Sequence, residues 1–154
     1  MITLPFKAFA MDLALEQARL AAARGEVPVG AVIVDEASRR VIAAAGNESV
    51  RRCDPTAHAE MVAIRRATAA LGSTRLTGCS LYVTLEPCAM CAGGISLARL
   101  DRLYFGAADP KGGGVLHGAK FFQQSTCHHR PEVYEGISEN DSSELLRSFF
   151  RSRR

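Results

Sequence analysis

The feature of this sequence that most restricts its fold is a pair of separate segments rich in metal-binding side chains. They are His58-Ala59-Glu60 and Pro87-Cys88-Ala89-Met90-Cys91. Cys88 and Cys91 are three positions apart, so at the start of a helix their sulfur atoms point to one side and can share a metal ion. The partial positive charge of a helix N-terminus also favours thiolate over thiol. The fold must therefore bring two helix starts together.

The residue types predict a catalytic metal centre. One imidazole, from His58, and two thiolates, from Cys88 and Cys91, are ligands that zinc prefers, and they leave its fourth tetrahedral position open. Glu60, two residues after His58, can lie beside that position, where a carboxylate takes a proton from water and returns it to a substrate nitrogen. The alternative is a structural zinc clip completed by another ligand, in which Glu60 would have no purpose.

Hydrophobic spacing and turn residues predict four helices and five strands. The helices are expected at residues 6–24, from an N-cap at Thr56 to before Gly72, from Pro87 to residue 98, and at 142–154; the strands are expected at 29–35, 40–46, 79–85, 102–107 and 132–136. Their order predicts an α/β fold, a mixed sheet covered by helices on both faces. The glycine-rich segment 108–120 lacks the GxxxxGK[ST] pattern, which argues against a P-loop.

Length and composition predict one globular domain over residues 1–154. Hydrophobic residues make up 47% of the chain and charged residues 23%, which argues against disorder. No apolar stretch is long enough to span a membrane, and charged residues interrupt the N-terminal region, so we expect neither secretion nor membrane insertion. Five cysteines, an odd number, argue against a disulfide framework and for a reducing cytoplasm. Cys53 and Cys79 are expected to be buried, inert thiols.

The net charge of +3 is modest, but the basic residues are unevenly placed. The last eight residues, RSFFRSRR, hold four arginines and no acid. Phe149 and Phe150 are adjacent, so on a helix they cannot both face the core. Phe150, near Arg151 and Arg153, would suit stacking on an extruded nucleotide while arginines hold phosphates. The alternative is one phenylalanine in the core and the other in a dimer contact.

Several motifs together resemble the zinc-dependent cytidine deaminase-like superfamily and, within it, the bacterial tRNA adenosine deaminases. They are EVPVGAVIV (26–34), GN (46–47), TAHAEMVAIR (56–65), LYVTLEPCAMCAGGIS (81–96), FGAADPKGG (105–113) and FFRSRR (149–154). The resemblance implies a three-layer α/β/α fold with a five-stranded mixed sheet, assembled as a homodimer. It also implies the conversion of the wobble adenosine, position 34, of an arginine tRNA to inosine.

The resemblance further implies roles for individual residues. His58, Cys88 and Cys91 would bind one Zn²⁺ ion, and Glu60 would move protons during catalysis. The substrate would be contacted by Asn47 through its side-chain amide, by Pro28, Val29 and Ala59 around the base, by Asp109 and Lys111 at flanking nucleotides, and by Phe150 and Arg153 on the terminal helix.

Two other functions remain open at the level of sequence. The same zinc site could deaminate a free base or nucleoside, such as guanine or cytosine, although a free base does not need the arginine-rich terminus. The chain could also be a non-catalytic RNA-binding module that contains zinc. The segment 115–131 departs most from the family pattern, and its role is open. With His117 upstream, Cys127-His128-His129 could suggest a second metal site, but the spacing matches no standard zinc finger.

Overall fold

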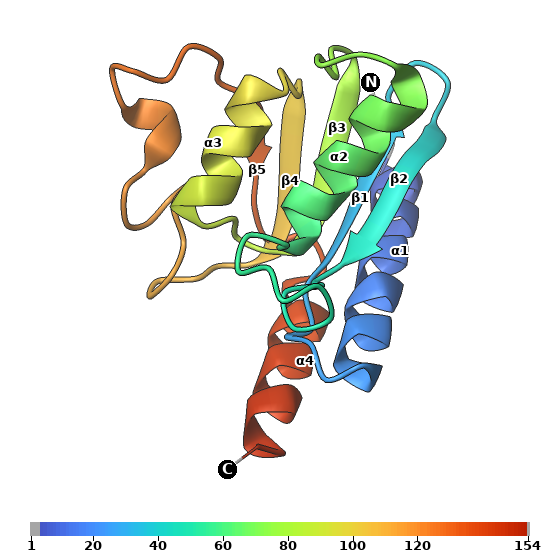
Figure 1. Ribbon diagram of the computed structural model, residues 1–154, viewed down its shortest axis with the longest axis vertical. Helices are drawn as coiled ribbons and strands as arrows, with labels where there is room; N and C mark the ends of the chain where they lie inside the picture. Colours follow the sequence, from blue (N-terminus) through green and yellow to red (C-terminus); the bar gives the residue numbers. More distant parts are fainter. Residues whose placement is uncertain (1–3, 154) are drawn as a thin grey trace.

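A five-stranded mixed sheet, in the order β2-β1-β3-β4-β5, runs through the computed structural model, which describes residues 4–153 (Figure 1). The strands are β1 (Gly30–Asp35), β2 (Arg40–Gly46), β3 (Cys79–Leu85), β4 (Arg102–Ala107) and β5 (Glu132–Tyr134). The helices are α1 (Leu4–Ala23), α2 (Ala59–Leu71), α3 (Ala89–Leu97) and α4 (Glu139–Arg151), with a short 3-10 helix, η1 (Phe121–Gln123). None of these described helices is both long and apolar enough to cross a membrane.

Two hydrophobic clusters hold helices to opposite faces of the sheet. On one face, Ile33 and Leu81 pack with Val62 of α2 and Ile95 of α3. On the other, residues of β1, β3 and β4 pack with α1, and the partly buried Leu145 of α4 joins them. The expected three-layer α/β/α architecture with a five-stranded mixed sheet is therefore confirmed.

Strand direction brings several chain ends to one edge of the sheet. β1 is antiparallel to both β2 and β3, whereas β3, β4 and β5 are parallel. The carboxyl ends of β2, β3 and β4 therefore meet the amino end of β1, and the Gly30 N–H donates to Thr84 Oγ1 over 3.1 Å. Ligands of open α/β sheets bind beyond the carboxyl ends of the strands, which marks this edge for a site.

Gly30 is the position at which α1 comes closest to the sheet. A Cβ atom there would lie 1.8 Å from the carbonyl oxygen of Ala14 and 2.7 Å from the amide nitrogen of Ala18. Both are backbone atoms that cannot rotate away, so only glycine permits this packing of α1 on β1.

Some helix boundaries differ from those expected. Thr56 does not cap α2, because its hydroxyl donates to Asp54 over 2.7 Å in a turn that precedes the helix. His58 is the N-cap instead. Cys88, rather than Pro87, directly precedes α3, and it is that helix's N-cap. α4 begins three residues earlier than expected, at Glu139, and β5 ends at Tyr134 instead of continuing to residue 136.

The prediction that Cys53 is buried was wrong. Cys53 is exposed, because it lies in the loop after β2 with a φ of 50°. Cys79 is buried as expected, and burial is the first cause that raises the pKa of its thiol to about 11.

The segment 115–131 packs against α3 and the core. Phe122 and Cys127 are buried with the α2–α3 side of the sheet. The hydroxyl of Ser96, on α3, donates to the carbonyl of His129 over 2.7 Å, and His129 Nε2 donates to the carbonyl of Leu100 over 2.6 Å. Cys127 and His129 thus tie this segment to the end of α3.

Candidate active site

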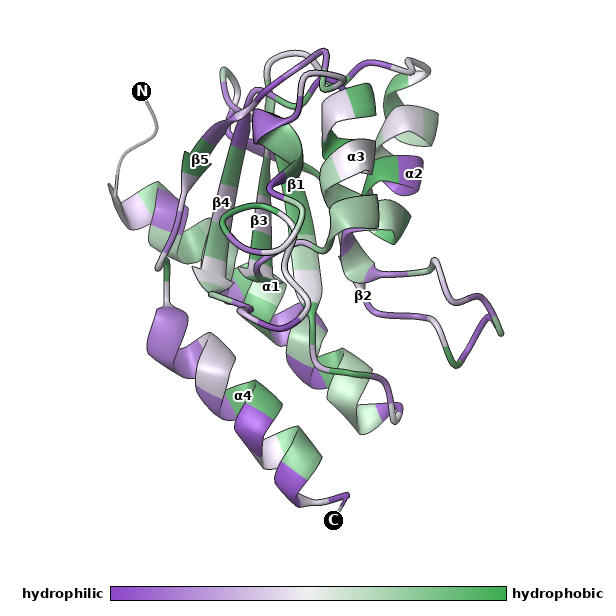
Figure 2. Ribbon diagram, turned by 90° about the vertical axis from the view of Figure 1, so that its left-hand side faces the viewer, coloured by the Kyte–Doolittle hydropathy of each residue, from purple (hydrophilic) through white to green (hydrophobic). Residues whose placement is uncertain are grey.

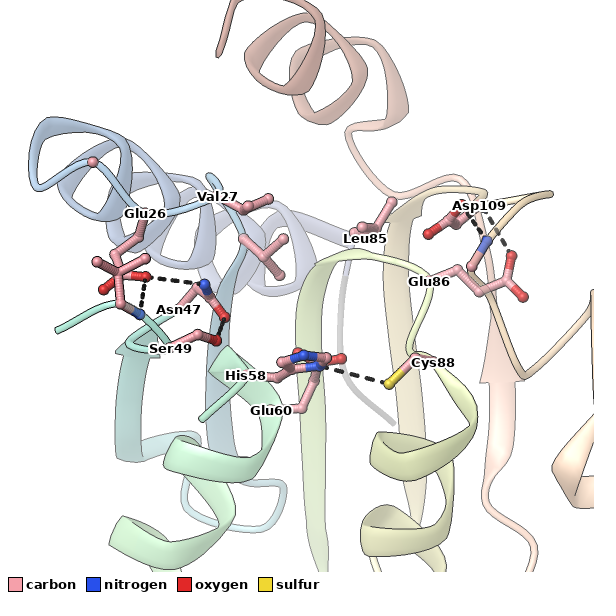
Figure 3. A pocket seen from close by; sticks show the side chains of 14 residues that line it. Glu26, Val27, Asn47, Ser49, His58, Glu60, Leu85, Glu86, Cys88 and Asp109 are labelled. Atoms are coloured by element: carbon pink, nitrogen blue, oxygen red, sulfur yellow. Dashed lines mark hydrogen bonds between the residues drawn. The ribbon is translucent and has the colours of Figure 1, made fainter. Parts of the chain in front are cut away.

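Two helix N-caps form the centre of the site. His58 caps α2 and Cys88 caps α3, and Cys91 follows one turn into α3. His58 Nδ1 lies 3.6 Å from Cys88 Sγ and 3.5 Å from Cys91 Sγ. All three donor atoms lie within 4.8 Å of one another, so they could hold one metal ion. The fold has brought together the two segments that the sequence singled out (Figure 3).

The electrostatics of this cluster favour thiolate. The hydrogen bond from Cys91 is the main cause that lowers the pKa of the Cys88 thiol to about 4, while burial acts in the opposite direction. The same hydrogen bond, followed by burial, raises the pKa of Cys91. Cys88 is therefore the more acidic thiol of the pair, and a bound zinc ion would favour the thiolate of both cysteines. An imidazole and two sulfur ligands are a donor set that fits zinc and leaves one position for another ligand.

Glu60 lies beside this cluster on the first turn of α2. Glu60 is only 4% exposed, and this burial is the main cause that raises the pKa of its carboxyl group. Glu60 also lines the pocket described below. A buried carboxyl with a raised pKa, next to a metal site, has the character of a general acid–base group.

A pocket of about 400 Å³ opens at this edge of the sheet and ends on the cluster. It is lined by Gly25, Glu26, Val27, Val29, Asn47, Ser49, Val50, His58, Glu60, Leu85, Glu86, Cys88, Asp109 and Gly112. Figure 3 shows Asn47 and Glu26 on one side, Glu86 and Asp109 on the other, and His58 and Cys88 between them. The walls come from the ends of β2, β3 and β4 and the start of β1, the strand ends that topology gathers here.

The region of the sheet and helices that builds this pocket matches a known protein family. The model of the cytidine and deoxycytidylate deaminase zinc-binding region covers residues 6–107. The chain belongs to this family. The matched residues include His58, Cys88 and Cys91, and the expected cofactor, one Zn²⁺ ion, is confirmed.

Individual relatives match this chain over more of its length than the family model does. A protein of Agrobacterium fabrum named tRNA-specific adenosine deaminase is 58% identical over 144 residues, which make up 94% of this chain and 93% of the relative. A structure solved in a study of A-to-I editing by tRNA:A34 deaminases has a TM-score of 0.87 at 56% identity, covering 90% of this chain and 99% of that one. A guanine deaminase structure from Bacillus subtilis has a TM-score of 0.62 at 39% identity, over 65% of this chain and 63% of its own.

The substrate residues expected from the resemblance fall into three groups. Asn47, Val29 and Asp109 line the pocket. Pro28 and Ala59 are buried and lie outside the set of lining residues. The third group lies outside the pocket: Lys111 is in the loop after β4, Phe150 is on α4, and Arg153 follows the end of that helix. The roles of all three groups stay predictions.

A second hollow, of about 550 Å³, lies between α4 and the loop after β4. It is lined by Lys111, Leu146, Arg147, Phe150 and Arg151. Phe150 is 50% exposed whereas Phe149 is 9% exposed, so only one of the two rings is buried, as expected. The Arg153 guanidinium lies 3.8 Å from the ring centroid of Phe149, not over the exposed Phe150.

Glu26, a buried carboxylate that holds the Asn47 side chain, was not predicted from the sequence. Asn47 Nδ2 donates to Glu26 Oε1 over 3.2 Å, and the backbone N–H groups of Val50 and Arg51 donate to the same carboxylate over 3.0 and 2.8 Å. On the other side of the amide, the Ser49 hydroxyl donates to Asn47 Oδ1 over 3.3 Å. Asn47 therefore keeps one N–H and one lone pair for a ligand.

Glu86, which binds the backbone of the loop after β4, was also not predicted from the sequence. Its carboxylate accepts the backbone N–H groups of Asp109, Val115, Leu116 and His117 over 2.9 to 3.2 Å, and His117 Nδ1 over 2.8 Å. Burial would raise the pKa of Glu86, but these hydrogen bonds outweigh it and lower the pKa. Glu26 lies in the segment EVPVGA (26–31) and Glu86 in TLEPC (84–88). The signal in the sequence that could have identified both residues was a single acid next to an apolar strand.

Proposed function

We propose that this protein hydrolytically deaminates the wobble adenosine, position 34, of a tRNA to inosine. The observation that carries the proposal is a pocket of about 400 Å³, within the range of small-molecule sites, that ends on Glu60 and the His58–Cys88–Cys91 cluster. The identity to proteins named tRNA-specific adenosine deaminase over most of both chains supports adenosine in tRNA as the substrate.

The chemistry divides between the metal ligands and Glu60. His58, Cys88 and Cys91 hold the zinc ion, which when bound supplies the Lewis acidity that makes water a nucleophile at neutral pH. Glu60 takes a proton from the attacking water and delivers it to N1 of adenine. Oxygen bonds to C6. Glu60 then takes the proton of the new C6 hydroxyl and passes it to the amine as the C6–N6 bond breaks and C6=O forms. Adenine and water thus give hypoxanthine and ammonia, with Glu60 restored.

Asn47 orients the base in this proposal. When N1 and N6 of adenine face the reacting groups, the remaining ring nitrogens, N3 and N7, are acceptors. Asn47 has one N–H left after Glu26 accepts the other. That N–H donates to the ring and fixes the face of the base, while Val29 and Leu85 supply apolar walls.

The hollow beside α4 supports RNA over a free base. C6 of adenine is out of reach in a stacked helix, whereas an anticodon loop can extrude a base at low cost. Phe150 offers a stacking surface, and Lys111 offers a charge for a flanking phosphate. Arg147 and Arg151 share one acid, Glu144, over 3.2 Å each, so the pair adds one further net positive charge. We propose an arginine tRNA as the substrate on the family resemblance alone.

We also propose that the protein is a homodimer that associates through α3. Met90 is 37% and Leu97 is 78% exposed, and their spacing of seven residues places them on the same side of the helix. Sedimentation should give twice the mass of the chain, and Leu97→Glu should give the monomer. A monomeric wild-type protein at micromolar concentration would contradict the dimer.

Deamination assays with the zinc-loaded protein test the function. An anticodon stem-loop with adenine at the wobble position should yield inosine, while free adenosine, guanine and cytosine should yield little ammonia. Ammonia from guanine alone would favour the chemistry named for the Bacillus subtilis structure. The RNA specificity constant should also fall steeply with salt, because a polyanion releases counterions on binding.

A Glu60→Gln variant separates an enzyme from a binding module. The variant should lose turnover by at least about a hundredfold, because a general acid–base group contributes roughly 10²–10⁴. RNA affinity, measured by filter binding, should be retained. Unchanged inosine formation would remove Glu60 from the mechanism.

A further inference from the structure

The loop between β2 and α2, residues 47–58, carries arginines at the rim of the pocket. Ser49 and Val50 line the pocket, and Arg51 and Arg52 follow them directly. The side chains of Arg51 and Arg52 are 62% and 50% exposed. Figure 2 shows this hydrophilic loop projecting from the α2 side of the molecule, away from α4. The rim therefore carries two exposed arginines that lie outside the hollow beside α4.

Residues 47–58 hold two arginines and two acids, and Arg66 of α2 adds a third guanidinium group beside Glu48. Glu48 is buried, and its carboxylate pairs with Arg52 Nε and, over 2.9 Å, with Arg66 Nη2. Arg51 Nη1 lies 3.9 Å from the same carboxylate, beyond hydrogen-bond distance. Asp54, the other acid of the loop, accepts the N–H and hydroxyl of Thr56 over 2.8 and 2.7 Å. One buried carboxylate thus faces three guanidinium groups, and the third is not needed to pair it.

The backbone of this loop is held in place. Glu26 accepts the N–H groups of Val50 and Arg51, and the N–H of Arg52 donates to the Glu48 carbonyl over 2.9 Å. The Arg51 guanidinium makes no hydrogen bond within the described residues 4–153. Its N–H donors are therefore available to a ligand, on a side chain whose backbone is held in place. A pre-organised donor loses less entropy when it binds a ligand.

We propose that Arg51, with Arg52 beside it, binds RNA phosphates at the part of the pocket rim formed by residues 47–58. This inference rests on the proposed function, because an adenosine extruded into the pocket leaves its flanking phosphates on both rims. The α4 hollow takes the phosphates on one side, and the arginine loop takes those on the other. Guanidinium groups suit this task because their planar donors match phosphate oxygens.

Arg51→Ala is the direct test, because Arg51 is exposed and its loss leaves the Glu48 pairs with Arg52 and Arg66 intact. Binding of a wobble-adenine stem-loop would be measured with zinc-loaded protein at several salt concentrations. Each phosphate contact on a single strand contributes about 0.7 to the salt slope. The variant should therefore bind about fivefold more weakly at 0.1 M salt, with a slope smaller by about 0.7, and the difference should vanish near 1 M.

Two variants serve as controls. Arg51→Lys keeps the charge and should retain most of the slope. Arg75→Ala removes an exposed arginine in the loop before β3, at the opposite end of that strand from the pocket, and should bind like wild type. A wild-type slope for Arg51→Ala, with the wild-type protein still producing inosine in the RNA, would overturn this inference alone. No inosine from the wild-type protein would overturn the proposed function instead.

Discussion

Glu26 controls the orientation of Asn47, and so its effect on catalysis should pass through that residue. Three N–H groups donate to the Glu26 carboxylate. Glu26→Gln replaces one of its two acceptor oxygens by an NH₂ donor, so at least one of these hydrogen bonds is lost. Losing one hydrogen bond to a charged group costs about 1.5–3 kcal/mol. We expect kcat/KM for the stem-loop to fall about tenfold or more, mainly through KM, while zinc content stays at one ion per chain.

A double-mutant cycle separates this role from a purely structural one. In an Asn47→Ala background, Glu26→Gln should have little further effect on kcat/KM, because coupled residues are not additive. Fully additive losses would mean that Glu26 acts on the site by another route, such as the backbone of Val50 and Arg51.

At the scale of residues, the sequence predicted the His58–Cys88–Cys91 cluster better than the residues that orient the side chains of the pocket, such as Glu26. The approach of His58 to Cys88 and Cys91 was predictable, because the two cysteines share one helix start and zinc chemistry restricts a third partner to a few residue types. The role of Glu26 was not, because two of its three donors are backbone groups of Val50 and Arg51. Backbone donors leave no mark in a sequence, and their position depends on a loop that no periodicity describes.

At the scale of elements, the contact of α1 with β1 depends on Gly30. Gly30→Ala would place a methyl group against the Ala14 carbonyl, and overpacking of this kind costs about 1–3 kcal/mol. Gly93→Ala is the matched control: its added Cβ meets the Phe121 ring at an ordinary 3.8 Å, and alanine suits helix α3 better than glycine. Urea unfolding should show Gly30→Ala destabilised and Gly93→Ala unchanged or stabilised. Equal stability of the two variants would refute the close-packing argument.

The elements themselves were predictable where periodicity is strong and less so at their ends. β3 and β4 were placed correctly because each is a short apolar run bounded by breaks in the pattern. The start of α2 was misplaced because Thr56, a good capping residue, forms a side-chain turn with Asp54 instead. As an N-cap, the Thr56 hydroxyl would accept a backbone N–H. Here it donates to Asp54, and only the surrounding fold decides between the two hydrogen bonds.

At the scale of the whole molecule, Glu48 should make the free energy of unfolding depend on pH. Burial alone would raise its pKa, but the hydrogen bond from Arg52 and the charges of Arg66, Arg52 and Arg51 outweigh it, so the pKa is lowered. A lowered folded-state pKa gives stability that is complete above the unfolded value, about pH 4.3, and is lost as the pH falls through the folded value.

Glu48→Gln should therefore flatten the pH dependence of stability below about pH 5, where the wild-type carboxylate begins to take up protons on unfolding. The zinc ligands and Glu86 also titrate in acid, but they are the same in both proteins, so the difference in slope isolates Glu48. Urea unfolding at equal zinc concentration, from neutral pH downwards, measures it. Parallel curves for the two proteins would mean that the arginines around Glu48 do not stabilise its charged form in the folded state.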